Sequence, residues 1–224
     1  MTCIGYIGVE AFDIILYIAK SICMLNIPVL IVDISGTDAL AQTIYHGMDL
    51  DSKENIVQYR SLNYIRRIPD AKELKAFEEG VIFVVYGFCY NESISFHHPD
   101  FLNIIVNPFP HNLQKVNHIM SHFSSSPINI KLIVRDIVTI DDFDRVRRSM
   151  ASGIKPYKSM YLYYDLDDYE NAMQCQILQV IRFKKISLGM KRLIMAELGD
   201  ILPKIKPESR RKAFCLARKG DNHR

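Results

Sequence analysis

The sequence predicts an α/β protein with three layers, in which helices cover both faces of a mostly parallel sheet. Short apolar runs alternate with helical patterns along the chain, as expected when parallel strands are joined by helical crossovers. The run Val81-Ile82-Phe83-Val84-Val85 is apolar at every position, which is typical of a strand buried on both faces. The 224 residues, 49% hydrophobic and 24% charged, suffice for one well-filled domain and do not favour disorder.

Six strands and seven helices follow from these patterns. The expected strands are 3–7, 29–34, 81–87, 103–107, 130–135 and 159–164. The expected helices are 11–25, 37–46, 70–78, 111–123, 141–151, 167–182 and 187–202. Asp141 is an expected N-cap, as is Asp167 or Asp168 for the following helix. Two short runs between residues 55 and 66 fit either a hairpin or an added pair of edge strands.

The connection from the first strand to the first helix carries an unusual set of charges. A phosphate-binding loop at such a turn needs glycines for close backbone approach, a lysine for the phosphates and a Ser or Thr hydroxyl for magnesium. Here Gly5 and Gly8 are present, but no Lys or Arg occurs before Lys20. Glu10 and Asp13 stand where phosphates would lie. We therefore interpret Gly5, Gly8, Glu10 and Asp13 as a degenerate nucleotide loop.

The second expected strand carries the sharpest family signal. Pro28-Val29-Leu30-Ile31-Val32-Asp33-Ile34-Ser35 resembles the strand that follows the first helix in ParA/MinD-like P-loop ATPases, which have a deviant Walker A motif and belong to the SIMIBI class. The next segment, Gly36-Thr37-Asp38-Ala39-Leu40, is also similar, and a coarser resemblance extends over residues 1–202. The resemblance implies the ParA/MinD-like P-loop NTPase fold. It also implies that Asp33 and Ser35 occupy a switch-like position.

The departures from that family bear on activity. Both lysines of the deviant Walker A motif are missing, and Ser35 replaces the second acid of the first switch. Tyr86-Gly87-Phe88 stands where the Walker B acid is expected. Phosphoryl transfer depends on positioned positive charge and magnesium. We therefore expect a pseudo-ATPase with no catalytic residue, no bound ATP or other cofactor and no metal. An unorthodox ATP-binding switch that uses Glu10 or Asp33 as metal ligand is a weaker alternative.

A basic tail follows the expected domain. Pro203 and Pro207 should end the last helix, which divides the chain into a domain at 1–202 and a C-terminal tail at 203–224. Eight Lys or Arg against two acids give the tail a charge of +6, and the total of +3 leaves −3 for residues 1–202. Anionic lipid and DNA phosphates are both suitable partners for such charge. The tail residues considered for this contact are Lys204, Lys206, Arg210, Arg211, Lys212, Arg218 and Lys219.

Other residue patterns are weaker. The five cysteines are widely spaced without a C-x-x-C pair, which favours reduced thiols in a cytoplasmic protein. The sequence begins with a strand-like segment and lacks the basic segment with which a secretory signal starts, so we expect no such signal. His118 and His122 have metal-ligand spacing on a helix but lack an accompanying acid, so a solvated helix face is the simpler interpretation. Tyrosines cluster around the last strand and suit either core or a partner surface, namely Tyr157, Tyr161, Tyr163, Tyr164 and Tyr169.

Two functions from different classes remain open at this stage. The resemblance, combined with the eroded loop, is similar to TadZ/CpaE-type pilus-assembly and secretion localisation proteins. It implies a non-catalytic adaptor, cytoplasmic or peripheral at the inner face of the membrane, that forms a homodimer and docks to a membrane-bound pilus or secretion machine. The alternative is a nucleic-acid-associated partition or regulatory module, in which Lys184, Lys185, Lys191 and Arg192 extend the basic tail.

Overall fold

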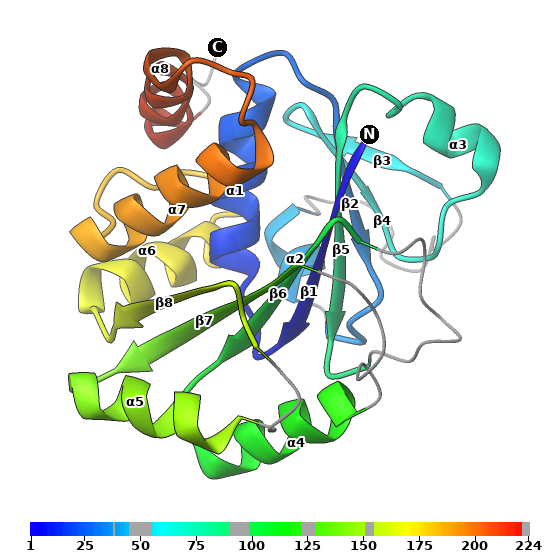
Figure 1. The fold of residues 1–224 in the computed structure, drawn as a ribbon. Coiled ribbons are helices and arrows are strands. Elements are labelled where there is room, and N and C mark those ends of the chain that lie inside the picture. Colours follow the sequence, from blue (N-terminus) through cyan, green and yellow to red (C-terminus); the bar gives the residue numbers. More distant parts are fainter. Residues whose placement is uncertain (38, 45–54, 90–98, 122–128, 151–154, 221–224) are drawn as a thin grey trace.

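The computed structural model describes residues 1–37, 39–44, 55–89, 99–121, 129–150 and 155–220, and it contains an eight-stranded sheet. The strands run in the order β3-β4-β2-β5-β1-β6-β7-β8 (Figure 1). All neighbouring strands are parallel except β3 and β4, which are antiparallel. Their bounds are β1 Thr2–Gly8, β2 Val29–Asp33, β3 Val57–Tyr59, β4 Leu62–Ile65, β5 Val81–Gly87, β6 Phe101–Val106, β7 Asn129–Ile137 and β8 Lys158–Tyr163.

Helices cover both faces of this sheet. Helices α1, α7 and α8 lie on one side, and α4 and α5 lie on the other (Figure 1). Their bounds are α1 Phe12–Cys23, α2 Ala39–Ile44, α3 Ala71–Lys75, α4 Pro110–Met120, α5 Ile140–Ser149, α6 Leu166–Ile177, α7 Leu188–Ile201 and α8 Pro207–Lys219. The predicted three-layer α/β fold is therefore confirmed.

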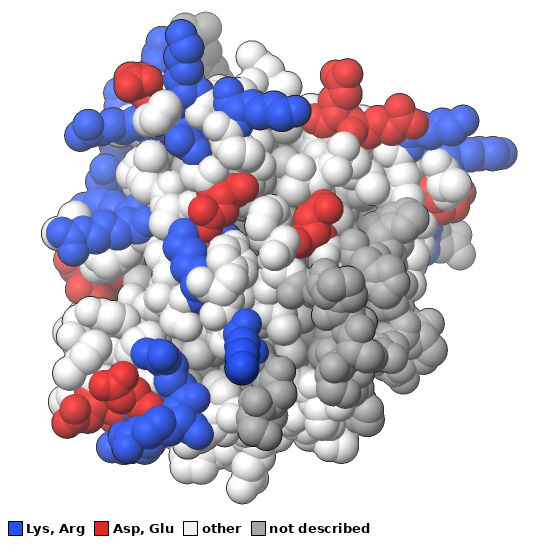
Figure 2. Space-filling model, in the orientation of Figure 1, with Lys and Arg blue, Asp and Glu red and all other residues white. Residues whose placement is uncertain are grey.

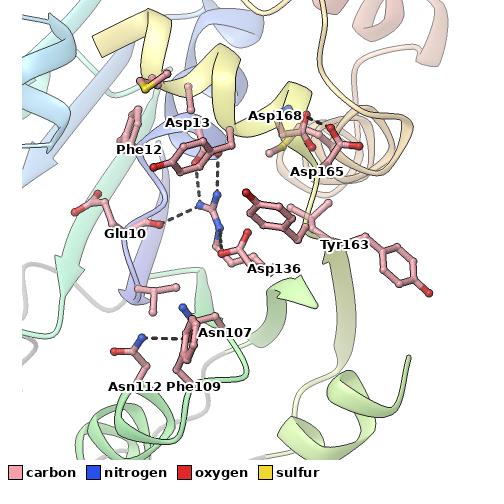
Figure 3. Close-up of a pocket in the computed structure, with 18 of the residues that line it drawn as sticks. Glu10, Phe12, Asp13, Asn107, Phe109, Asn112, Asp136, Tyr163, Asp165 and Asp168 are labelled. Atoms are coloured by element: carbon pink, nitrogen blue, oxygen red, sulfur yellow. Dashed lines mark hydrogen bonds and ion pairs between the residues drawn. The ribbon is translucent and has the colours of Figure 1, made fainter. Parts of the chain in front are cut away.

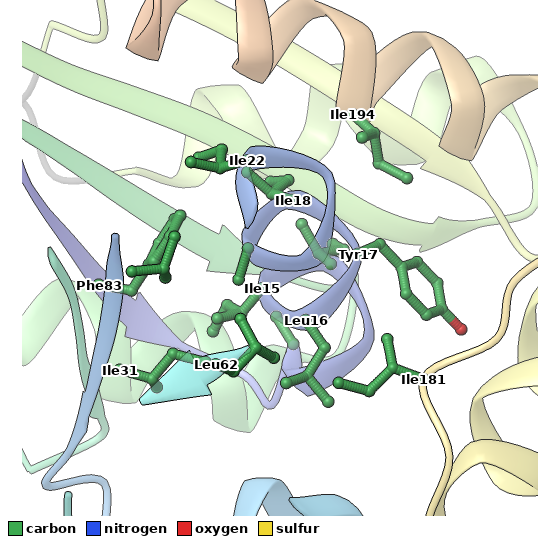
Figure 4. Packing of buried hydrophobic residues seen from close by; sticks show 14 of the residues in the cluster. Ile15, Leu16, Tyr17, Ile18, Ile22, Ile31, Leu62, Phe83, Ile181 and Ile194 are labelled. Atoms are coloured by element: carbon green, nitrogen blue, oxygen red, sulfur yellow. The ribbon is translucent and has the colours of Figure 1, made fainter. Parts of the chain in front are cut away.

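The core has two parts because alternate strand residues face opposite sides of the sheet. In β1, Ile4 and Tyr6 pack with α1, whereas Cys3 and Ile7 pack with α4 and α5 on the other side. Helix α1 is buried over nearly its whole length, from Asp13 to Cys23. It is surrounded by the sheet, by α7 and by the segment that follows α6 (Figure 4). A helix that is apolar all round is expected in such a central place.

The predicted elements are present, and most bounds agree within a few residues. Helix α6 is an exception, because it ends at Ile177 instead of continuing to residue 182. Gln179 takes a left-handed backbone (φ 48°), and the chain then turns to bury Ile181 and Phe183. The ring of Phe183 stacks on Tyr17 of α1 at 4.3 Å between centroids. Burial of these two side chains outweighs the helical pattern in the sequence.

Two helix caps also differ from the prediction. Thr139, and not Asp141, is the N-cap of α5, where it forms a capping box with Asp142. Asp165 caps α6 by accepting from the amides of Asp167 and Asp168. The carboxylate of Asp168 instead accepts from the Ser187 amide and hydroxyl, both at 2.6 Å. It thereby fixes the start of α7 against α6.

The ambiguous segment 55–66 is a hairpin at the edge of the sheet. β4 pairs with β2 in parallel, and β3 pairs with β4 in antiparallel register. Arg60 and Ser61 at its tip both have positive φ, as a tight hairpin turn requires. Both sequence interpretations are thus correct, because this hairpin supplies the added pair of edge strands.

The basic tail forms helix α8, which packs against α1 and α7. Ala213, Phe214 and Ala217 are buried in this contact. The guanidinium of Arg218 donates to the carbonyl of Phe183, which adds a polar tie to the apolar contact. The apolar side of the amphipathic element therefore faces the protein body, and its basic residues face outward.

A buried ion pair connects the sheet to α7. Lys131 of β7 and Glu197 of α7 are both nearly inaccessible, and their Nζ and Oε1 atoms lie 2.8 Å apart. Lys131 also contacts Asp200 at 2.9 Å. Burial alone would lower the pKa of Lys131, but the charges of Glu197 and Asp200 outweigh burial and raise it. Asn103 donates to the second oxygen of Glu197.

Candidate functional site

The candidate site lies at the carboxyl ends of β1, β6, β7 and β8. The chain passes from β1 through α1 to β2, whereas β6, β7 and β8 lie on the other side of β1. Connections therefore diverge at β1, and the carboxyl ends of strands at such a switch point are the usual place for ligands in open α/β sheets. Glu10 and Asp13 lie at this edge (Figure 3), and Arg135 lines the same cavity.

The connection from β1 to α1 is short. Only Val9, Glu10 and Ala11 separate Gly8, the end of β1, from Phe12, the start of α1. The Val9 amide already donates to the carbonyl of Ile105 at 2.9 Å. A phosphate cradle needs a longer loop whose amides point at the ligand. This connection is too short to surround a phosphate, and the amide of Val9 is already bonded.

The two glycines of the predicted loop have different places. Gly8 has φ 110°, and a Cβ at this position would lie 1.9 Å from the Ile105 carbonyl oxygen. It is therefore required by the close approach of β6. Gly5 lies inside β1, where its missing side chain makes room for Leu102 and Tyr86. Gly5 is part of the packed sheet and does not lie in the connection.

Arg135 at the end of β7 joins the connection and α1. Its two terminal nitrogens contact the two carboxylate oxygens of Asp13 at 3.0 and 3.1 Å. One of them also donates to the carbonyl of Glu10 at 3.0 Å (Figure 3). Burial acts to lower the pKa of Arg135, but the charges of Asp13 and Asp136 outweigh it and raise that pKa. We call this arrangement of Arg135, Asp13 and Glu10 the arginine clamp.

The switch-like residues belong to a hydrogen-bonded chain that ends at Glu10. Asp33 is buried at the end of β2 and accepts from Tyr64 at 2.8 Å and from the Ser35 hydroxyl at 2.7 Å. The Ser35 and Thr37 hydroxyls are 3.0 Å apart, and Thr37 donates to Glu10 at 2.5 Å. Burial raises the pKa of both Asp33 and Glu10. The structure thus brings Glu10, Asp33 and Ser35 together through Thr37.

A cavity of about 740 Å³ opens beside the clamp. Five carboxylates line it, and Arg135 is the single Lys or Arg among its described lining residues. The carboxylates belong to Glu10, Asp13, Asp136, Asp165 and Asp168. Aromatic side chains form much of the remaining wall: Phe12, Phe88, Phe109, Tyr163, Tyr164 and Tyr169. The cavity has the volume of a ligand site, and its charge favours a cationic group.

Sequence reasoning did not single out Arg135. A lone arginine at the end of an apolar strand, directly before an acid, was the available signal. The tyrosine cluster was recognised, and Tyr163, Tyr164 and Tyr169 line the cavity. The basic residues of α8 lie elsewhere, beside the far end of α1 (Figure 1).

The weaker metal hypothesis rested on histidines. His122 lies outside the described residues, whereas His118 is on α4. Among the residues that the structure describes, no group of three or more His, Cys, Asp or Glu is placed to hold a metal ion. The described helices also include none that is long and apolar enough to cross a membrane.

Comparisons of the whole chain with solved structures identify a known fold. The chain is similar to the MinC:MinD cell division complex of Aquifex aeolicus, with a TM-score of 0.60 and 14% identity over 89% of this chain and 96% of that one. It is similar to the ParA family ATPase of Chlorobium tepidum, with a TM-score of 0.55 and 16% identity over 96% and 97% of the chains. No protein-family model and no curated protein sequence matches it. The chain has the ParA/MinD P-loop NTPase fold.

A third similar structure shows a nucleotide on the same fold. The putative plasmid partition protein of Borrelia burgdorferi B31, bound to AMPPNP, has a TM-score of 0.57 and 11% identity over 96% of this chain and 98% of that one. At such identities the similarity establishes the fold alone. The chemistry of the site has to be judged from its own residues.

Proposed function

We propose that this chain is a non-catalytic protein of the ParA/MinD fold that acts by binding other macromolecules and does not bind or hydrolyse ATP. The observation that carries the proposal is the arginine clamp. It contacts the amino-terminal end of α1 through Asp13. At this end of the helix, ATPases of this fold present amides and a lysine to phosphates. In this chain that place holds the carboxylate of Asp13, which is only 2% exposed.

Electrostatics support the same conclusion. The first turn of α1 begins Phe12-Asp13-Ile14-Ile15 and supplies neither a cation nor a hydroxyl. Nucleoside triphosphates bring several negative charges, and stabilising them requires nearby Lys, Arg or magnesium. Here the guanidinium of Arg135 is already paired with Asp13, and the cavity has an excess of carboxylates. A triphosphate at this position would meet repulsion.

We further propose that the partner is a protein. The resemblance to TadZ/CpaE-type localisation proteins suggests an adaptor at a membrane-associated pilus or secretion machine, cytoplasmic or peripheral at the inner face of the membrane. Homodimerisation is also part of this proposal. Tyr163, Tyr164 and Tyr169 are exposed beside the candidate site and support contact with the partner protein there, because tyrosine is enriched at interfaces.

Calorimetry with magnesium and ATP or ADP tests the proposal directly. The full-length protein at high concentration should give no binding heat, and phosphate release should equal the rate without protein. Magnesium-dependent binding heat would overturn the proposal and favour the unorthodox ATP-binding switch. An intact fold in the same buffer, shown by cooperative thermal unfolding, makes a silent titration meaningful.

The basic surface of α7 and α8 favours a second candidate function, that of a nucleic-acid-associated partition or regulatory module. Between Arg182 and Lys219 there are twelve Lys or Arg and three acids. Two of the acids, Glu197 and Asp200, are paired with lysines of the sheet. Lysine and arginine side chains gather over α8 (Figure 2). Because the apolar side of α8 is buried, its exposed charges fit phosphates of a nucleic acid better than insertion into a lipid layer.

Salt-dependent binding of duplex DNA tests this second candidate. Fluorescence anisotropy should show binding that weakens as salt rises, with a log–log slope of about −0.9 per phosphate contacted. Replacing Arg211 and Lys212 with Glu should weaken it, whereas the same change at Lys72 and Lys75 of α3 should not. Equal effects of the two double variants would contradict a surface on α8.

A further inference from the structure

Helix α6 presents an exposed apolar stripe beside the cavity. Leu166, Tyr169, Met173 and Ile177 follow the spacing of one helix face, and their exposed fractions are 71%, 60%, 44% and 71%. The opposite face of α6 buries Ala172 and Cys175 against the body. The helix is therefore already anchored, and the stripe is not needed for its packing. Contiguous exposed apolar surface of this kind marks a docking site.

The stripe and the cavity form one continuous surface. Tyr169 and Met173 belong to the stripe and also line the cavity. The cavity continues from them to Tyr163 at the end of β8 and to the clamp (Figure 3). A partner lying along the stripe would thus reach the carboxylates with its next side chains. We call this combined surface the α6 groove.

The charge of the α6 groove selects the partner. Asp168 is the acidic residue of α6 that lines the cavity, whereas Asp167 and Glu170 line a separate hollow together with Arg182, Lys184 and Lys185. The helix N-cap Asp165 and the neighbouring Asp136 add to this charge. Arginine and lysine pair with carboxylates and also lie favourably over tyrosine rings. The groove therefore offers both kinds of contact to a cation, together with apolar contacts along α6.

We propose that the α6 groove binds a segment of a partner protein that carries apolar side chains at helical spacing together with Lys or Arg. Its apolar side chains cover Leu166, Tyr169, Met173 and Ile177. At least one of its cationic side chains enters the cavity between Tyr163 and the carboxylates. This inference deepens the proposed adaptor function, on which it rests, by assigning the contact surface and the chemistry of the partner.

Selection from a library of random displayed peptides tests the inference, because such a selection requires no candidate partner. The biotinylated full-length protein is the target, and enriched peptides are synthesised and measured by fluorescence anisotropy. We expect enrichment of Arg or Lys together with Leu, Ile or Phe. The variant Asp136→Asn/Asp165→Asn removes two carboxylates from the cavity and keeps a side chain that can cap α6, and it should weaken these peptides by at least about ten-fold. The matched control Glu78→Gln/Glu79→Gln, which removes the same charge from an exposed segment after α3, should bind like the wild type.

The apolar half of the groove needs its own variant. Tyr169→Ala/Met173→Ala should also weaken the selected peptides by at least about ten-fold, because anchors in an interface carry much of the binding free energy. Leu216→Ala on α8, an exposed apolar position away from the groove, is the control. Thermal unfolding of each variant shows whether it folds. The single change Asp136→Asn replaces a charge variant that does not fold, and Met173→Ala replaces an apolar variant that does not fold.

The outcomes are decisive. No enrichment, enrichment of neutral or acidic peptides, or binding that both groove variants leave unchanged would overturn the inference. Concentration-dependent self-association that the groove variants abolish would assign the groove to a second copy of the chain and would also overturn it. The ATP titration is independent of these results. Silent ATP titrations with no peptide binding would refute the groove alone, whereas ATP binding would refute the adaptor function itself.

Discussion

Replacing Arg135 with Met should destabilise the protein through the arginine clamp. The change keeps the aliphatic stem but removes three hydrogen bonds, two to Asp13 and one to the Glu10 carbonyl. Asp13 is 2% exposed and would be left as a buried carboxylate without its charged partner in the first turn of α1. Breaking a buried pair by removing one partner costs about 3–5 kcal/mol.

The expected cost lies at the lower end of this range. Arg135 is 17% exposed, so water screens part of the pair. Asp13 lies in the first turn of α1, where the helix dipole stabilises a negative charge by about 0.3–1 kcal/mol. We therefore expect a loss of about 3 kcal/mol in the free energy of unfolding. At about 2–4 °C per kcal/mol for a chain of this size, Tm should fall by about 6–12 °C.

Urea unfolding and thermal melts measure this effect, with Arg145→Met as the matched control. Arg145 is 65% exposed and pairs with Asp142 at 3.6 Å on the surface of α5. Its loss should cost less than about 1 kcal/mol. The double variant Asp13→Leu/Arg135→Met should regain most of the lost stability, because apolar replacement of a buried pair is often neutral. Equal costs for the two single variants, or no recovery in the double variant, would refute this account.

Three further changes test other contacts of the fold. Lys131→Met should cost about 3–5 kcal/mol in urea unfolding, and Lys131→Met/Glu197→Leu should recover most of it. Gly8→Ala should cost at least about 3 kcal/mol by the same measurement, because its Cβ would collide with the Ile105 carbonyl at a positive φ. Burial raises the pKa of Glu10 in the folded protein. The free energy of unfolding therefore falls as pH rises from the pKa of Glu10 in the unfolded chain through its higher pKa in the folded protein. Glu10→Gln should therefore gain stability over the wild type in melts as pH rises from about 4 to about 7, and a constant difference would contradict this.

The sheet and its helices were predictable because their signals are local. The apolar run of β5 and the period of α1 are each visible within a dozen residues. The end of α6 was not, since it depends on Phe183 meeting Tyr17, which lies far away in the sequence. The cap at Thr139 was missed for a local reason. Asp141 and Asp142 follow Thr139, and only the backbone geometry shows that Thr139 is the N-cap and that Asp142 completes the capping box.

The site was predictable only in part. Glu10 and Asp13 stand out in sequence because acids replace the expected cation and hydroxyl at a strand-to-helix turn. Arg135 is 122 positions away from Asp13, and only the parallel order of β1, β6 and β7 brings the two side chains together. Gly5 shows the converse, because a glycine that fits a loop motif in sequence serves the packing of β1 against Leu102.

The double variant Asp13→Leu/Arg135→Met also separates two physical reasons for excluding phosphates. One is charge, which this variant changes by removing a carboxylate and its paired guanidinium. The other is backbone geometry, because three residues between Gly8 and Phe12 cannot surround a phosphate and the Val9 amide is bonded to Ile105. Since that geometry remains, we expect the double variant to recover stability and still give no heat with magnesium and ATP. Binding of ATP by this variant would show that the pair of Asp13 and Arg135 is what excludes phosphates in the wild type, and that the short connection can accept a phosphate.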